Sequence, residues 1–378
     1  VIAMPIYLLY NHIFYYKERI INSDEGFPLY NFVEHNVVDM VNFRILQVIY
    51  SIPPILFNVL GFDVKIIAIV YAISFSAPVF ITMYILYKHS FKYYLIFILS
   101  YTFFISYQYY FPIAEYWLGT CLYFILYMLL DKYNTTISNK IVAGIILILI
   151  LNLHLSLFYP SVVLLVYMYM KKKVNLKFLF ILIFLSFVYI LIKILFLTPE
   201  YESNIILNNN SIVENLNIFR SRILYEFLKS WDWIPLLLVI IFILYFKKSK
   251  ISYTELLLIS FLLIPLLIIS YIFHDFPYFF YCIGNLRILL LFLPIFFYDY
   301  CPKSVFKIIT ICLLFISIIK IETYGILLKE RYNNINQLLK STDENIIYTF
   351  DENVCIVHYK YIYMQTMTVN LLENNKNN

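Results

Sequence analysis

The chain has 378 residues, of which 62% are hydrophobic, 20% are aromatic and only 13% carry a charge. This composition excludes an ordinary soluble globular domain and is typical of proteins with several membrane-spanning segments. The formal net charge of +5 is modest, and we expect no nucleic-acid partner. The five cysteines show no CxxC spacing and no paired histidines, which argues against a zinc site or a redox motif.

Long apolar runs recur along the chain and must be helical in a bilayer, because a spanning backbone has no water to satisfy its polar groups. We predict an all-α fold, a polytopic transmembrane helical bundle of about 11 helices with external loops and a small external C-terminal segment. The first helix is the short apolar stretch 1–16, interpreted as the surviving end of a span because no signal-peptide features are visible. Further spans are predicted at 64–87, 93–110, 113–130, 141–153, 155–170, 178–197, 234–246, 254–272, 288–300 and 304–321.

The stretch 141–170 has two interpretations. It forms either one long helix bent near Asn152 and Pro160, or two short tilted helices that meet at Asn152-Leu153-His154. A single helix would exceed the roughly 20 residues of a perpendicular span, and each of two helices would fall short of it. The pattern leaves both open.

Two adjacent carboxylates, Asp24 and Glu25, lie in the mixed segment 17–63 that follows the first helix. Acidic side chains beside a membrane bundle are costly unless they serve a metal, a proton or a cationic partner. The alternative is a solvated loop with an incidental acidic pair. We therefore ask whether other parts of the chain supply groups that meet these two carboxylates.

The second half of this segment, 42–60, carries Arg44, which would be expensive inside a bilayer. We predict an amphipathic helix that lies in the membrane interface and is ended by Pro53-Pro54 and a short apolar turn. A true span is the alternative.

The distribution of lysines predicts the orientation of the bundle. On one side, short loops receive Lys88, Lys92, Lys132, Lys140, Lys171, Lys172, Lys173, Lys177, Lys247, Lys248, Lys250, Lys303 and Lys307. Short loops rich in lysine lie in the cytoplasm. We therefore expect a multi-pass protein of the plasma membrane, the inner membrane in a bacterium. The acidic pair, the loop 198–233 and the tail 322–378 then face outward.

The tail contains two β-like runs, 345–350 and 354–364, which predict a small external hairpin. No repeat or low-complexity linker separates a second large domain.

The predicted outer face gathers groups suited to a phosphate-bearing substrate. Carboxylates there can act as a general base or bind a hard divalent ion, and guanidinium groups suit bidentate phosphate binding. The candidate catalytic residues are Asp24, Glu25 and Glu115, with Asp24 and Glu115 as possible ligands of Mg²⁺ or Mn²⁺. The candidate substrate-binding residues are Arg44, His154, Arg220, Arg222, His274 and Arg287. Each has an ordinary structural alternative, such as a solvated face, a helix-start acid or an interfacial anchor.

This layout resembles the GT-C superfamily of membrane glycosyltransferases. The resemblance rests on Asp24-Glu25 with Tyr30, the following helix 42–60, Glu115 at the next external turn and the long external loop 198–233. It covers roughly residues 1–233 as a GT-C-like module, followed by further spans at 234–321 and the tail 322–378.

The resemblance implies transfer of a sugar from a polyisoprenyl-phosphate donor to a glycan or lipid-linked acceptor on the outer face of the membrane, in cell-surface glycan synthesis. It places the general base on Asp24 or Glu25. Glu115 is a single acid and not part of a DxD motif, so the resemblance does not by itself imply a bound metal. No cofactor beyond such a metal is implied.

Two alternatives remain open. The segment around Asn152-Leu153-His154-Leu155-Ser156 also resembles a region of O-antigen or exopolysaccharide polymerases. A lipid or solute transporter or flippase is the other alternative, although inverted repeats are not detectable and the charges gather on one face.

Overall fold

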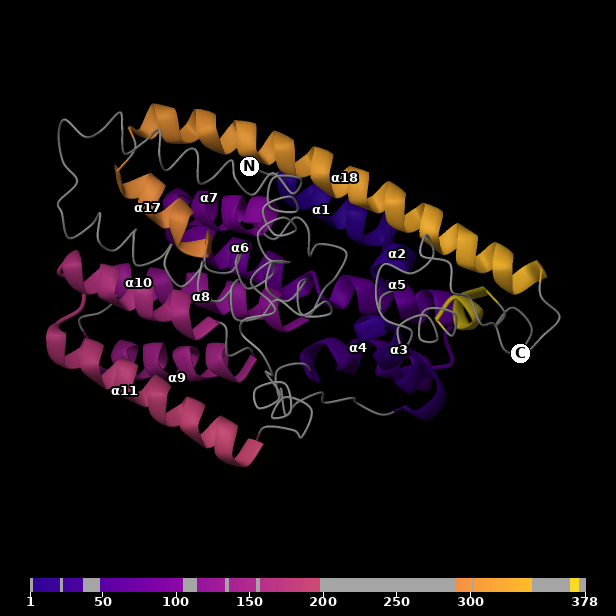
Figure 1. Ribbon diagram of the computed structural model, residues 1–378, viewed down its shortest axis with the longest axis horizontal. Coiled ribbons are helices and arrows are strands. Elements are labelled where there is room, and N and C mark those ends of the chain that lie inside the picture. The colour runs from indigo at the N-terminus through magenta and orange to yellow at the C-terminus, as the bar shows by residue number, and fades with distance from the viewer. Residues whose placement is uncertain are drawn as a thin grey trace, which may run out of the picture. The chain divides into compact units, whose positions relative to one another are not determined.

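The computed structural model describes residues 3–20, 23–36, 48–104, 114–132, 136–153, 157–197, 290–300, 302–341 and 368–373 (Figure 1). Every regular element within these ranges is a helix, and none is a strand. This confirms the all-α prediction for the part of the chain described. The predicted hairpin of the tail and the predicted spans 234–246 and 254–272 lie outside the described residues.

The chain divides into two compact units, Val1–Cys121 with Thr310–Asn378, and Leu122–Ile309. The predicted boundary at residue 233 lies outside the described residues. The predicted boundary at residue 321 falls inside one continuous helix, α18 (Lys303–Ser341).

The first unit begins with α1 (Ala3–Phe14) and α2 (Tyr16–Ile20), which are separated only by Tyr15. Tyr15 still donates its backbone N–H to the Asn11 carbonyl, and Arg19 donates to the Tyr15 carbonyl, so the helix continues with a slight break. The elements that follow are α3 (Ser23–His35), α4 (Val48–Val59), α5 (Val64–Ser74), α6 (Ala77–His89), α7 (Phe91–Leu99) and the π-helical turn Ser100–Phe104.

Helices α4 and α5 form an antiparallel hairpin around Gly61. The Gly61 N–H bonds to the Asn58 carbonyl and the Phe62 N–H to the Phe57 carbonyl, while Gly61 has a φ of 76°. These bonds, with the Phe57 and Phe62 rings 4.8 Å apart, make a Schellman cap, which needs a residue of left-handed conformation. The helix therefore packs lengthwise along α5, and Tyr50 lies against Phe75 with ring centroids 4.8 Å apart.

This arrangement corrects one expectation about 42–60. The helix does not stop at Pro53-Pro54 but runs through them to Val59. The prolines remove two N–H donors, yet packing against α3 and α5 holds the helix together. Its described part lies along α5 instead of crossing it, because the glycine turn reverses the chain. This described part, 12 residues, rises about 18 Å. Residues 42–47 lie outside the described residues, so the choice between an interfacial helix and a span stays a prediction.

The predicted span 64–87 corresponds to α5 and α6. Together they cover Val64–His89, which is 26 residues long and apolar enough to cross a membrane. A slight break at Phe75-Ser76, both of which keep right-handed helical dihedrals, separates them. Pro78, which has no N–H, stands in the first turn of α6. Ser90 then ends α6 and caps α7 by accepting a hydrogen bond from the Lys92 N–H.

The second unit contains α9 (Ile137–Leu153), α10 (Phe158–Met170) and α11 (Leu176–Ile192), which continues as the π-helical turn Lys193–Leu197. Two separate helices thus replace the alternative of one bent helix over 141–170. Helices α9 and α11 run parallel. Lys140 lies over the Phe178 ring at their beginnings, and Asn152 donates to the Tyr189 hydroxyl near their ends. Helix α10 packs on both.

Several lysines of this unit, Lys140, Lys171, Lys172, Lys173 and Lys177, lie near the turn from α10 into α11. Lys173 contacts the Asp131 carboxylate at 3.1 Å and the Asp131 carbonyl at 3.0 Å, so the end of α8 (Ala114–Lys132) lies beside this turn. Because α9 and α11 start together, Lys140 and Lys177 are at the same end of the helices. This grouping is the one that the charge distribution predicts.

Helix α18 is 39 residues long, about 58 Å, and is the second helix apolar enough to cross a membrane. A bilayer core is only about 30 Å thick. Its charges are denser toward the end: Lys303 and Lys307 stand near its start, whereas Lys320, Glu322, Lys329, Glu330, Arg331 and Lys340 follow from residue 320 on. The predicted span 304–321 is therefore continued by a helical extension.

Large apolar side chains are exposed on several helices. On α11, Phe180, Phe184 and Phe187 are each more than half exposed, and on α18 the same holds for Ile308, Ile311 and Phe315. Contiguous exposed faces of this kind indicate contact with lipid or with another protein. Helix α17 (Leu293–Tyr300) and the short turn Leu290–Phe292 are further described elements of the second unit, where Tyr167 donates to the Asp299 carboxylate at 2.7 Å.

Candidate functional site

The acidic pair predicted as the catalytic centre lies in a helix. Asp24 and Glu25 are the second and third residues of α3, which packs against α2, α4 and α5. A loop was expected there. The first turn of a helix favours acidic side chains, because its unpaired N–H groups carry partial positive charge. Glu115 likewise occupies the second position of α8.

The two acidic positions belong to the first compact unit, but the structure describes only their backbone. Whether the carboxylates meet therefore stays a prediction. The other predicted site residues lie outside the described residues: Arg44, His154, Arg220, Arg222, His274 and Arg287. Among the side chains that the structure does describe, no group of three potential metal ligands occurs. The side chains of Asp24 and Glu115, the predicted metal site, are not among those described, so this finding does not bear on that site.

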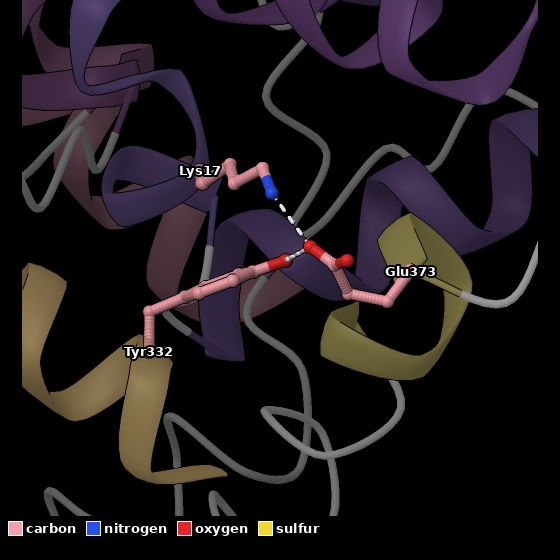
Figure 2. A network of polar contacts seen from close by, with 3 residues as sticks. All are labelled: Lys17, Tyr332 and Glu373. Carbon is pink, nitrogen blue, oxygen red and sulfur yellow. Dashed lines mark hydrogen bonds and ion pairs between the residues drawn. The ribbon is translucent and has the colours of Figure 1, made fainter. Parts of the chain in front are cut away.

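A polar cluster stands immediately before the acidic helix. Figure 2 shows Lys17 of α2 and Tyr332 of α18 converging on one carboxylate oxygen of Glu373, which belongs to the helical segment 368–373. The Lys17 Nζ donates to Glu373 Oε1 at 2.6 Å, and the Tyr332 hydroxyl donates to the same oxygen at 2.7 Å. The ammonium also lies over the Tyr332 ring, 4.9 Å from its centroid. We call these three residues the Lys17 cluster.

The Lys17 cluster is largely shielded from solvent. The side chains of Lys17 and Glu373 are only 28% and 16% exposed. Burial raises the pKa of the Glu373 carboxyl, but the hydrogen bonds from Lys17 and Tyr332 and the charges of Lys17 and Lys65 outweigh it and lower the pKa below its ordinary value. Glu373 therefore stays ionised at neutral pH, and its contact with Lys17 is a true ion pair.

The neighbouring Glu18 has the opposite tendency. Burial raises the pKa of its carboxyl, and a backbone hydrogen bond and the charges of Lys329 and Lys17 offset only part of that rise. The pKa of Glu18 is thus raised and that of Glu373 lowered, although both carboxyl groups lie beside α2.

Helix α1 packs on α18 through a second carboxylate. Tyr7 donates to one oxygen of Glu322 and Tyr15 donates to the other, both at 2.9 Å. Two turns further on, the Lys329 ammonium lies over the Phe14 ring at 5.3 Å. Figure 1 shows α18 running beside α1 and α2 in the same direction.

The face of α1 and α2 that turns inward becomes polar along its length. Met4 and Leu8 are buried at its beginning, whereas Asn11, His12 and Arg19 are buried further on, each at most 2% exposed. His12 meets the Phe80 ring edge-on, with centroids 6.4 Å apart. Ionisable groups buried in an apolar bundle mark functional sites more often than structural ones.

In the second unit, Lys193 is buried at the end of α9. Its Nζ is 2.9 Å from the Asn152 carbonyl and 3.4 Å from the Leu151 carbonyl, and the residue is 3% exposed. A lysine at this position binds carbonyls that have no partner within the helix and faces the negative end of the helix dipole. Lys193 therefore holds the end of α9, just before His154 in the sequence.

Sequence reasoning missed these groups. Asn11-His12 interrupts the apolar run 1–16, and Lys193 interrupts the predicted span 178–197. Either interruption was a usable signal, since polar residues inside apolar runs are rare. No sequence signal pairs Lys17 with Tyr332 or Glu373, because their separation in the chain exceeds 300 residues.

Comparisons with protein-family models, with curated proteins and with solved structures find no match for this chain.

Proposed function

We propose that this chain is a polytopic membrane glycosyltransferase that transfers a sugar from a polyisoprenyl-phosphate donor to a glycan or lipid-linked acceptor on the outer face of the membrane. Exposed apolar faces on α11 and α18 and two helices long enough to cross a bilayer support the membrane setting. In a bilayer, those faces contact lipid chains and need no protein partner.

One observation carries the proposal. The acidic pair stands in the first turn of a folded helix, α3, which is packed between the N-terminal helices and the α4–α5 hairpin. A catalytic carboxylate must be held in place to act, and a helix packed on three neighbours holds it better than a solvated loop. The scarcity of charge elsewhere in the chain adds to the significance of two adjacent acids.

The chemistry suits these residues. The acceptor hydroxyl loses its proton as its oxygen attacks the anomeric carbon, and Asp24 or Glu25 accepts that proton. The bond from the sugar to the phosphate oxygen breaks, and the polyisoprenyl phosphate leaves with the electron pair. Cationic groups such as Arg220, Arg222 and Arg287 are proposed to stabilise the leaving phosphate. A divalent metal held by Asp24 and Glu115 would supply the same stabilisation.

The decisive experiment replaces each acid by its isosteric amide. We expect Asp24→Asn and Glu25→Gln to differ sharply, and loss of the general base to cost on the order of 10²–10⁴-fold in transfer rate. We expect Asp24 to be the base. The readout is surface glycan in cells that carry each variant as the sole copy, at equal abundance of the protein in membranes.

Glu34→Gln is the matched control, because Glu34 is an exposed acid on the same helix. Its removal is expected to leave glycan assembly unchanged. Full assembly in cells that carry both Asp24→Asn and Glu25→Gln would refute a catalytic role of this segment and favour the transporter alternative.

A polymerase is the second candidate. Lys193 anchors the end of α9 at Asn152, where the polymerase-like segment begins. The length distribution of the glycan separates the two. Loss of a polymerase leaves single repeat units, whereas loss of a glycosyltransferase leaves the repeat unit incomplete.

A further inference from the structure

Three contacts between the N-terminal helices and α18 share one register, while the Tyr15 hydroxyl reaches back to Glu322, 307 positions away. Tyr7 pairs with Glu322, Phe14 with Lys329 and Lys17 with Tyr332, and each pair is separated by 315 positions in the sequence. A constant separation means that the two helices run parallel without slipping. The register continues from α1 across the break at Tyr15 into α2, and the Lys17 cluster lies at its far end.

The segment 368–373 closes this end. Thr368 and Val369 are fully buried, and Leu372 is 2% exposed, so the short helix is seated by apolar contacts as well as by Glu373. Glu373 contacts α2 through Lys17 and α18 through Tyr332 at the same oxygen. One carboxylate therefore joins three elements that are remote from one another in the sequence.

Helix α2 is the five-residue end of the helix that continues from α1 across Tyr15. The end of a helix frays unless other elements hold it, because its last carbonyls have no partner within the helix. Helix α2 packs directly on α3, whose first turn carries the acidic pair. A displacement of α2 is therefore passed on to the start of α3.

We infer that Lys17, Tyr332 and Glu373 are positioning residues: they clamp segment 368–373 and α18 onto α2 and thereby fix the acidic turn of α3. This inference rests on the proposed function for the role of the acidic turn, while the clamp itself stands on the contacts. A misplacement of about 1 Å at a catalytic group can cost 10²-fold in rate, so residues that touch no substrate can still control turnover.

The clamp is built to persist at neutral pH. The groups that face Glu373 are Lys17 and Tyr16 of the N-terminal helices, Tyr332 of α18 and Lys65 of α5, with Glu18 and Asp63 nearby. Because the folded-state pKa of Glu373 is lowered, its contribution is present above the ordinary glutamate pKa of about 4.3 and is lost as the pH falls through the lowered value. Protonation of Glu373 in acid is therefore expected to open the clamp.

The test is a charge reversal and its rescue in the full-length protein. Lys17→Glu and Glu373→Lys each place like charges together, and the double variant Lys17→Glu/Glu373→Lys restores opposite charges. Two readouts are measured: amide hydrogen exchange of residues 16–35 in detergent, and surface glycan assembly in cells at equal membrane abundance. Lys340→Glu, an exposed reversal on α18, is the control, and Glu373→Gln is the milder variant should a reversal fail to accumulate.

We expect each single reversal to raise exchange in residues 16–35 and to lower the transfer rate by roughly 10- to 100-fold, and the double variant to recover most of both. Unchanged exchange in the single variants would overturn the clamp. Raised exchange with undiminished transfer would overturn the positioning role. If the unaltered protein has no part in glycan transfer, the proposed function fails, while the exchange data still decide whether the clamp exists.

Discussion

The two compact units use their polar side chains in different ways. In the first unit, side chains bond to one another: Tyr7 and Tyr15 to Glu322, and Lys17 and Tyr332 to Glu373. In the second unit, Tyr167 likewise bonds to the Asp299 carboxylate, but lysines also bond to backbone carbonyls, Lys193 at the end of α9 and Lys173 at Asp131. Bonds to carbonyls cap the ends of single helices, whereas bonds between side chains join separate elements. Only a bond between two charged side chains can be restored by exchanging the two charges.

The largest effect on stability is expected from Lys193→Met. The substitution keeps the apolar stem but leaves the Leu151 and Asn152 carbonyls without their buried donor. Hydrogen bonds to charged groups contribute about 1.5–3 kcal/mol each, so we expect a loss of about 2–3 kcal/mol in the free energy of unfolding. Denaturation of the purified protein in mixed micelles measures it.

Lys177→Met is the control for this experiment, because Lys177 is exposed at the other end of the same helix. We expect it to change stability by under about 0.5 kcal/mol. Equal effects of the two substitutions would show that Lys193 does not cap α9 in solution.

A smaller effect is expected from Glu322→Gln in the first unit. The amide oxygen can accept from one tyrosine, but the amide nitrogen then faces the other hydroxyl, and the charge that strengthened both bonds is gone. The expected loss is about 1 kcal/mol, measured in the same denaturation assay. Glu330→Gln, at an exposed acid on the same helix, is the control and is expected to leave the free energy of unfolding unchanged.

The smallest effect is expected from Lys173→Ala. Lys173 bonds to a carbonyl and a carboxylate as Lys193 bonds to two carbonyls, but its side chain is 48% exposed. Exposed pairs contribute about 0.2–1 kcal/mol and weaken in salt. A loss that matches Lys193→Met, or one that salt does not reduce, would mean that burial does not set the difference between these two lysines.

Some features of this chain could be predicted from its sequence. Composition and apolar runs predict helices, and the structure confirms them in the ranges it describes. The charge pattern predicts that Lys140 and Lys177 lie at one end of their helices, which the parallel packing of α9 and α11 bears out. These features follow from the period of the helix and from the cost of burying charge, and both act over a few neighbouring residues.

Other features depended on the tertiary structure. The orientation of α4 depends on the left-handed turn at Gly61 and on the packing of Tyr50 against Phe75. The acidic pair lies in a helix because α2, α4 and α5 surround α3. The partners of Lys17, Glu322 and Lys193 lie up to several hundred residues away or on the backbone of another helix. A local pattern records which face of a helix is apolar, but the element that covers this face is decided by packing between segments remote in the chain.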